Sequence, residues 1–179
     1  RVLFRSQIIL ARSFDSEIPQ NADLQIINFD SLSSNKVKLK NDIDHVYLCL
    51  GKRLSTHELG YMQHSARESF KLIDFEYPLS IAKLAYDSGA RSIALVSAVG
   101  AQEGSFNYYF HIKGKLENEI RKIGYENICF ARPGHLLGAR KDFRGYEIPV
   151  LESGLKIAAP FMQGPLKNFR QIEARHVAE

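Results

Sequence analysis

A serine, a tyrosine and a lysine near the middle of the chain have types and a spacing that can do proton chemistry. Tyr109 and Lys113 stand four residues apart in a segment with helical character, so they share one helical face. A lysine ammonium beside a phenol favours the phenolate, and we expect it to lower the pKa of Tyr109. Such a phenol can exchange a proton with a carbonyl or alcohol oxygen, while the Ser97 hydroxyl can hold that oxygen.

Alternating strand and helix patterns position these residues. Apolar runs predict strands at 7–10, 24–28, 44–50, 92–96 and 126–131. Helical periodicity covers 68–87, where Pro78 either begins or kinks the helix, and a second helix runs from an N-cap at Ser105 to Gly124. Strands that are apolar at nearly every position predict an α/β fold, with a doubly wound parallel sheet covered on both faces. Ser97 then lies at the carboxyl end of its strand, where such sheets bind ligands.

Composition narrows the class of protein. The 179 residues fit one domain, and 45% hydrophobic with 25% charged residues can form a core. No apolar run approaches the ~20 residues of a membrane span, so we expect no membrane partner. The net charge is only +4, and the basic run Lys36–Lys40 lacks interleaved aromatic residues, so we expect no nucleic acid partner.

Metal binding and a disulfide are both disfavoured. His57, His64 and His111 show no metal-ligand spacing, so we expect no metal. Cys49 and Cys129 lie in strand-like runs that would be about 10 Å apart if they flank a third strand, which is too far to bridge. We therefore expect buried free thiols in a reducing compartment. Since no secretory signal is visible either, we expect a cytoplasmic protein.

Several segments of the sequence resemble those of one protein family. They are Val96–Ala101, Tyr109–Glu117, Ala131–Gly138 and, more loosely, Phe169–Ala178. Together they resemble the short-chain dehydrogenase/reductase superfamily, in its atypical or extended branch, which includes the Tat-interacting-protein-like NAD(P)H-binding proteins. The resemblance implies a Rossmann-like fold and a catalytic triad of Ser97, Tyr109 and Lys113 around a nicotinamide cofactor.

The resemblance also implies which residues bind the cofactor. In the family, a basic residue at the position of Arg12 contacts the 2′-phosphate of NADP, so the resemblance favours NADP(H) over NAD(H). The alternative is that Arg12 is an ordinary surface arginine at the end of a strand. Gly51 lets the backbone approach ribose and pyrophosphate, or is an ordinary turn glycine. The set of cofactor-binding residues implied in this way is Arg12, Leu50, Gly51, Lys113, Pro133 and Gly134.

One departure from the family pattern concerns the start of the chain. The family opens with a strand and a glycine-rich turn, whereas the first glycine here is Gly51. Residues Arg1–Ser6 look like a translated sequencing adapter, which leaves 7–179 as a partial NAD(P)-binding domain, truncated at both ends and lacking its first strand and glycine-rich turn. Without that turn, we expect this chain to bind NADPH weakly.

Two functions of different class are consistent with these residues. The first is an NAD(P)H-dependent oxidoreductase that acts on a carbonyl/alcohol or sugar-nucleotide-like small-molecule substrate. The alternative is a non-catalytic regulatory protein that senses NADPH. The resemblance also allows a homodimer, since members of the family often pair through helices like the one that carries Tyr109.

Overall fold

The chain forms two compact units in a computed structural model that describes residues 7–11, 22–26, 28–34, 39, 43–134, 136–137 and 172–173. One unit comprises Arg1–Lys40 and the other Asn41–Glu179. The candidate cofactor residue Arg12, His135 next to the candidate residue Gly134, and nearly all of the segment after Leu137 lie outside the described residues.

The first unit contains a pair of parallel strands. Strand β1 (Gln7–Ala11) pairs with β2 (Ala22–Ile26), with Gln7 opposite Ala22. A 3₁₀ helix follows, η1 (Phe29–Ser34), and buries Phe29. Both strands were predicted from their apolar runs, while the short helix was not.

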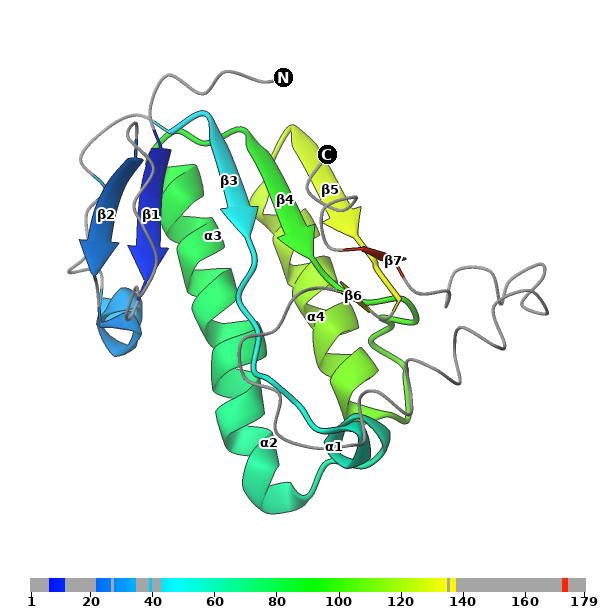
Figure 1. Ribbon diagram of the computed structural model, residues 1–179. Helices are drawn as coiled ribbons and strands as arrows, with labels where there is room; N and C mark the ends of the chain where they lie inside the picture. The colour runs from blue at the N-terminus through cyan, green and yellow to red at the C-terminus, as the bar shows by residue number, and fades with distance from the viewer. Residues whose placement is uncertain are drawn as a thin grey trace. The chain divides into compact units, whose positions relative to one another are not determined.

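The second unit contains a three-stranded parallel sheet in the order β3-β4-β5 (Figure 1). Its strands are β3 (His45–Leu48), β4 (Ser92–Val96) and β5 (Asn127–Ala131), within one or two residues of the predicted ranges. The register aligns Ile93 of β4 with Val46 and with Ile128. Ile93 and Leu95 are buried, as expected for the alternate residues of a strand that face a helical layer. The α/β, Rossmann-like fold class predicted from the sequence is confirmed.

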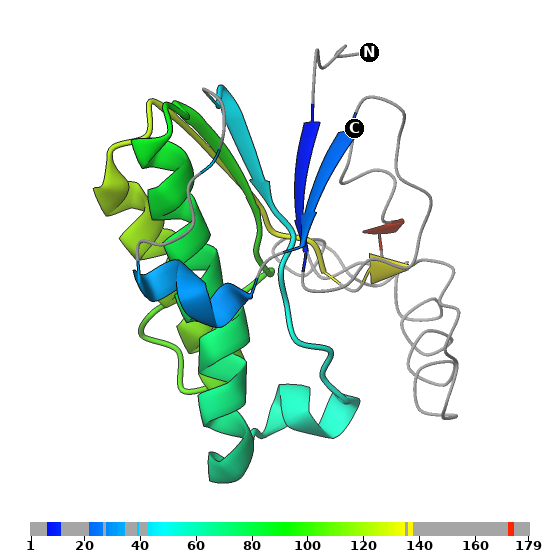
Figure 2. The same cartoon turned by 90° about the vertical axis from the view of Figure 1, so that its left-hand side faces the viewer.

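Helices cover one face of this sheet. The helices are α1 (Thr56–Gly60), α2 (His64–Lys71), η2 (Leu72–Glu76), α3 (Tyr77–Asp87) and α4 (Tyr108–Ile123). Figure 2 shows α3 and α4 on the same side of the three strands. Tyr47, Cys49 and Cys129 are exposed. The described helices therefore do not cover both faces as expected. The prediction of buried thiols is wrong, although both cysteines are free and their strands do flank β4.

A helix begins near Pro78, which is one of the two predicted alternatives: α3 starts at Tyr77, one residue before the proline. The backbone runs from α2 through the π-helical turn η2 into α3, with Pro78 in the first turn of α3. In η2 the Tyr77 N–H donates to the Leu72 carbonyl, five residues back. A proline lacks an N–H and its ring clashes with the carbonyl four residues before it, and the wider π turn gives the ring room. The helix ends at Asp87, as predicted, and Gly89, just beyond the C-cap Ser88, has φ +102°.

The helix with Tyr109 begins later than expected. Its N-cap is Asn107, whose side chain accepts from the Tyr109 and Phe110 N–H groups, and not Ser105. The Asn107 amide also donates to the Leu59 carbonyl at 2.9 Å, which ties the end of α1 to the start of α4. The helix ends at Gly124 with φ +106°, as predicted.

Two short strands complete the second unit. They are β6 (Leu136–Leu137) and β7 (Ile172–Glu173), which pair in parallel. Within the described ranges, none of the helices has the length and apolar character needed to span a membrane.

Candidate functional site

Tyr109 and Lys113 lie on one face of α4, as their spacing predicted. The Asn107 cap fixes the first turn of α4 and with it Tyr109. The Lys113 Nζ atom is 6.0 Å from the centre of the Tyr109 ring. That ring is half-buried and packs on Phe70 of α2, with 5.8 Å between ring centres. Packing on a fully buried side chain gives the phenol a defined position.

A buried carboxylate from the long helix meets this lysine. Asp74, in the π turn η2, is 1% exposed, and its Oδ1 atom lies 2.9 Å from the Lys113 Nζ. Its Oδ2 atom accepts from the Lys52 backbone N–H at 2.7 Å. The Lys52 ammonium donates to Ser69 instead of facing the site. Asp74 thus joins α4 to the turn that follows β3. This contact joins residues far apart in the chain and was not among the predicted site contacts.

Gly51 lies against the same ion pair. A Cβ atom at Gly51 would be 3.3 Å from Asp74 Oδ1 and 3.9 Å from Lys113 Nζ. The first distance is tighter than ordinary van der Waals contact, so a glycine lets the end of β3 approach the pair closely. We expected this glycine, next to Leu50, to let the backbone approach a cofactor; the structure shows that it also lets the backbone approach the Asp74–Lys113 pair.

The pKa of Tyr109 is raised, and our expectation that it would be lowered is wrong. Burial of the phenol and, after it, the negative charge of Asp74 raise this pKa to about 12. The Lys113 ammonium alone would lower the pKa of Tyr109, but the Asp74 carboxylate, 2.9 Å from the ammonium, offsets this lowering. In the free protein, Tyr109 therefore holds its proton throughout the physiological pH range.

Two polar groups at this position are available to a ligand. Lys113 is 5% exposed, and its ammonium, with three N–H donors, has Asp74 as its one hydrogen-bonding partner among the described residues. The Tyr109 hydroxyl has no hydrogen-bond partner in the same part of the chain. Buried donors normally find acceptors. The spare donors of Lys113 fit the hydroxyls of a ribose, so the residues present are compatible with a nicotinamide nucleotide.

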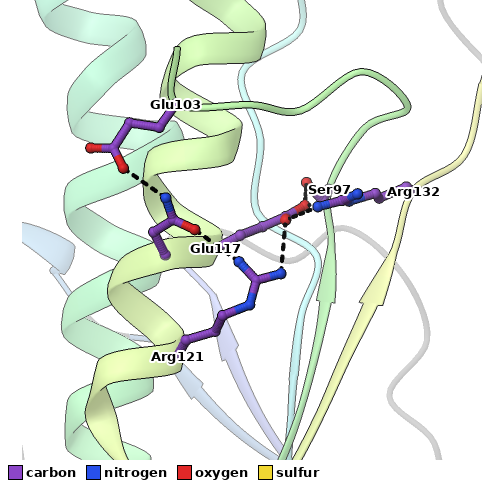
Figure 3. Close-up of polar contacts among 6 residues, drawn as sticks. Ser97, Glu103, Glu117, Arg121 and Arg132 are labelled. Carbon is purple, nitrogen blue, oxygen red and sulfur yellow. Dashed lines mark hydrogen bonds and ion pairs between the residues drawn. The ribbon is translucent and has the colours of Figure 1, made fainter. Parts of the chain in front are cut away.

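Ser97 belongs to a second cluster of polar side chains. Its hydroxyl donates to Glu117 Oε1 at 2.6 Å, two helical turns beyond Tyr109 on α4. The Arg132 guanidinium binds both carboxylate oxygens of Glu117, through Nε at 2.9 Å and through one terminal nitrogen. Arg121 adds an ion pair at 3.7 Å. Figure 3 shows the two arginines reaching Glu117 from different elements. The structure therefore turns the Ser97 hydroxyl toward Glu117.

The remaining predicted residues lie at the ends of the strands. The Pro133 carbonyl, just after β5, accepts from the Val99 N–H at 3.0 Å, so the turns after β4 and β5 adjoin. Gly134 follows and is half-buried. Within the described ranges, there is no group of three or more His, Cys, Asp and Glu side chains that could hold a metal ion.

Asp74 and Glu117 are the polar residues that sequence reasoning missed. A signal for both is present in the sequence. Asp74 falls on the helical face that also carries Phe70 and Ile81, and Glu117 falls between Leu116 and Ile120. An acidic residue on the apolar stripe of a helix is almost always buried with a partner.

Comparisons with known proteins give relatives in fungi and a mammal. No family model matches the chain. Protein FMP52 of Candida albicans, named as mitochondrial, is 38% identical over 112 residues, covering 62% of this chain and 49% of that protein. FMP52 of Debaryomyces hansenii, also named as mitochondrial, is 41% identical over 78 residues, covering 44% and 34%. Protein HTATIP2 of Rattus norvegicus is 25% identical over 145 residues, covering 79% and 56%. The chain thus spans about half or less of the length of these relatives.

Solved structures share the fold. A short-chain dehydrogenase family protein from Francisella tularensis superposes with a TM-score of 0.57 at 12% identity, covering 97% of this chain and 77% of that one. The UDP-glucose 4-epimerase of Thermotoga maritima, solved with UDP-glucose, gives a TM-score of 0.58 at 11% identity, covering 88% and 56%.

The comparisons also correct one expectation. We expected a cytoplasmic protein, but the FMP52 relatives are mitochondrial by name, which contradicts it.

Proposed function

Because the chain belongs to the short-chain dehydrogenase/reductase superfamily, in its atypical, Tat-interacting-protein-like branch, we propose that it carries the catalytic residues of a nicotinamide-dependent oxidoreductase. Its substrate is a small molecule with a carbonyl/alcohol group, of which a sugar-nucleotide-like compound is one kind. The observation that supports this most is the cluster of Tyr109, Lys113 and Asp74, where a phenol hydroxyl and a buried ammonium keep unused hydrogen-bonding capacity. The chain spans only about half or less of the length of the curated relatives it matches, so the activity is proposed for the whole protein, called the complete protein below.

Each residue of the proposed site has a separate task. Tyr109 donates a proton to the substrate oxygen, and Lys113 holds the nicotinamide ribose through its spare N–H donors. Leu50, Gly51, Pro133 and Gly134 lie along the proposed cofactor position at the ends of β3 and β5. When bound, the reduced nicotinamide supplies a hydride to the carbonyl carbon. Ser97 positions the substrate oxygen in this proposal, and its hydrogen must first leave Glu117.

We propose NADP(H) as the preferred cofactor. The support is the sequence position of Arg12, directly after the residues of β1, since a guanidinium suits a 2′-phosphate. In the complete protein, NADPH should bind more tightly than NADH by calorimetry, and Arg12→Ala should remove that difference. We also propose that the protein is mitochondrial, as the FMP52 relatives are named, which cell fractionation would test.

A non-catalytic NADPH sensor is the second candidate. The observation that favours it is the Ser97 hydroxyl, which is bound to Glu117 instead of being directed at a ligand. A sensor would bind NADPH tightly and consume none of it with any class of carbonyl compound.

Replacing Tyr109 in the complete protein tests the proposed function. NADPH oxidation is followed by absorbance across aldehydes, ketones and sugar nucleotides. Tyr109→Phe should lower turnover by about 10²–10⁴-fold while NADPH still binds, because general acid catalysis contributes about that much. Tyr108→Phe is the matched control, since that neighbouring ring packs under Arg67 and should leave turnover nearly unchanged. Equal rates for wild type and Tyr109→Phe would remove Tyr109 from the mechanism.

A further inference from the structure

The Asp74 carboxylate is placed to do more than neutralise a buried lysine. It is one of two nearly fully buried carboxylates in the described part of the chain, and each of its oxygens has a partner from a different element. Oδ1 binds the ammonium of Lys113 on α4, and Oδ2 binds the backbone of the turn after β3. A single side chain thus fixes the distance between two parts of the proposed cofactor site.

The backbone around this carboxylate is unusual in two places. Asp74 lies in the π turn η2, and single π turns within α-helices occur frequently at functional sites. Gly51 leaves the space that a Cβ would fill, 3.3 Å from Asp74 Oδ1. Both features bring the carboxylate, the turn after β3 and the lysine together, and a regular helix or a larger residue would disturb that arrangement.

The charges around Tyr109 come from several elements. Lys113 is on its own helix, and Asp74 comes from η2. Arg67 of α2 stacks on the adjacent Tyr108 ring at 4.8 Å, and the Lys52 ammonium is bound to Ser69. Burial raises the pKa of Tyr109 most, and the negative charge of Asp74 raises it further. The protonation state of Tyr109 therefore depends on Asp74, a residue outside α4.

We propose that Asp74 is a positioning residue of the candidate site: its carboxylate holds the Lys113 ammonium and the Gly51–Lys52 turn together and keeps Tyr109 as a proton donor. The inference rests on the proposed function and deepens it, because a site arranged in this way favours reduction of a carbonyl over oxidation of an alcohol. In that reaction the carbonyl carbon gains a hydride from NAD(P)H and its oxygen gains the Tyr109 proton. The products are an alcohol and NAD(P)⁺, and the phenolate regains its proton from water.

Titration of Tyr109 in this 179-residue chain tests the proposal without substrate. Tyrosine labelled with ¹³C at Cζ reports ionisation by NMR, and Tyr109→Phe identifies the resonance among the eight tyrosines. Asp74→Asn should lower the pKa of Tyr109 by about one unit or more, because removing a nearby negative charge favours the phenolate. Asp87→Asn is the matched control: Asp87 raises the pKa of Tyr125, so this variant should leave Tyr109 unchanged.

A second pair of variants covers the case in which Asp74→Asn does not fold. Lys113→Met is compared with the double variant that also carries Asp74→Asn and so has neither charge. Tyr109 should ionise at lower pH in the double variant. The inference is overturned if Asp74→Asn titrates like wild type, if Asp87→Asn shifts Tyr109 equally, or if the members of the second pair titrate alike.

The pH dependence of turnover in the complete protein separates this inference from the proposed function. A proton donor is lost as pH rises through its pKa, so Asp74→Asn should lose NADPH-dependent reduction at lower pH than wild type, and Asp74→Glu should keep the wild-type profile. An active Asp74→Asn enzyme with the wild-type profile would overturn the role of Asp74 alone. If no carbonyl compound is reduced, the proposed function fails, while the NMR titration still decides what Asp74 does to Tyr109.

Discussion

Asp74 and Glu117 are both buried carboxylates beside α4, each 1% exposed, yet their surroundings differ. Glu117 binds the Ser97 hydroxyl and Arg132, with Arg121 nearby, and these groups occupy both of its oxygens. Asp74 binds Lys113 and one backbone N–H, and its lysine partner keeps two N–H donors without acceptors in the described part of the chain.

This difference separates a structural cluster from a candidate site. Around Glu117 both carboxylate oxygens have partners, and these contacts connect β4, α4 and the residue that follows β5. The Lys113 ammonium, in contrast, has N–H donors without acceptors among the described residues. The Tyr109 hydroxyl beside it also has no hydrogen-bond partner among these residues. Buried polar groups left unsatisfied are costly, and a catalytic or binding role is one reason why a protein retains them.

The largest effect on stability should come from breaking the Glu117 cluster. Glu117→Ala leaves the buried Ser97 hydroxyl without its acceptor and the half-exposed Arg132 without its carboxylate, and it should lower the free energy of unfolding by about 2–3 kcal/mol. Urea denaturation of this chain measures the change. Glu119→Ala is the control: it removes a partly exposed acid on the same helix, paired with the exposed Lys122, and should have little effect. Equal midpoints for the two variants would mean that Glu117 is not a structural centre.

A smaller effect is expected where the backbone meets the Asp74–Lys113 pair. Gly51→Ala places a methyl group 3.3 Å from Asp74 Oδ1, so the pair must move, and we expect a loss of about 1 kcal/mol in the free energy of unfolding. Gly60→Ala is matched to it, because a methyl group at Gly60 meets nothing within 4 Å. If both variants unfold at the same urea concentration, the close approach at Gly51 does not contribute to the free energy of unfolding.

The sequence was sufficient for five of the strands, for the two long helical segments and for one pair of site residues, but not for η1, α1, β6 or β7. Apolar runs located the strands, because a buried parallel strand is apolar along its whole length. Helical spacing placed Tyr109 and Lys113 on one face, because that relation is local to α4. The start of α4 was misplaced because Ser105 and Asn107 are both good caps, and tertiary contacts to α1 favour Asn107.

What the sequence could not provide were partners far apart in the chain. Asp74 and Lys113 are separated by half a helix, a strand and a loop, so no local pattern joins them. The pKa of Tyr109 was predicted in the wrong direction for this reason, since the reasoning included the neighbouring ammonium but not the carboxylate that offsets it. The role of Ser97 was likewise assigned without Glu117.

The most direct test of the central claim is a crystal structure of the complete protein with NADPH bound. The account predicts that the Lys113 ammonium keeps Asp74 and adds a ribose hydroxyl at about 2.7–3.2 Å, with the Tyr109 hydroxyl facing the nicotinamide. A nucleotide bound elsewhere, with Lys113 and Tyr109 touching neither ribose nor nicotinamide, would contradict it.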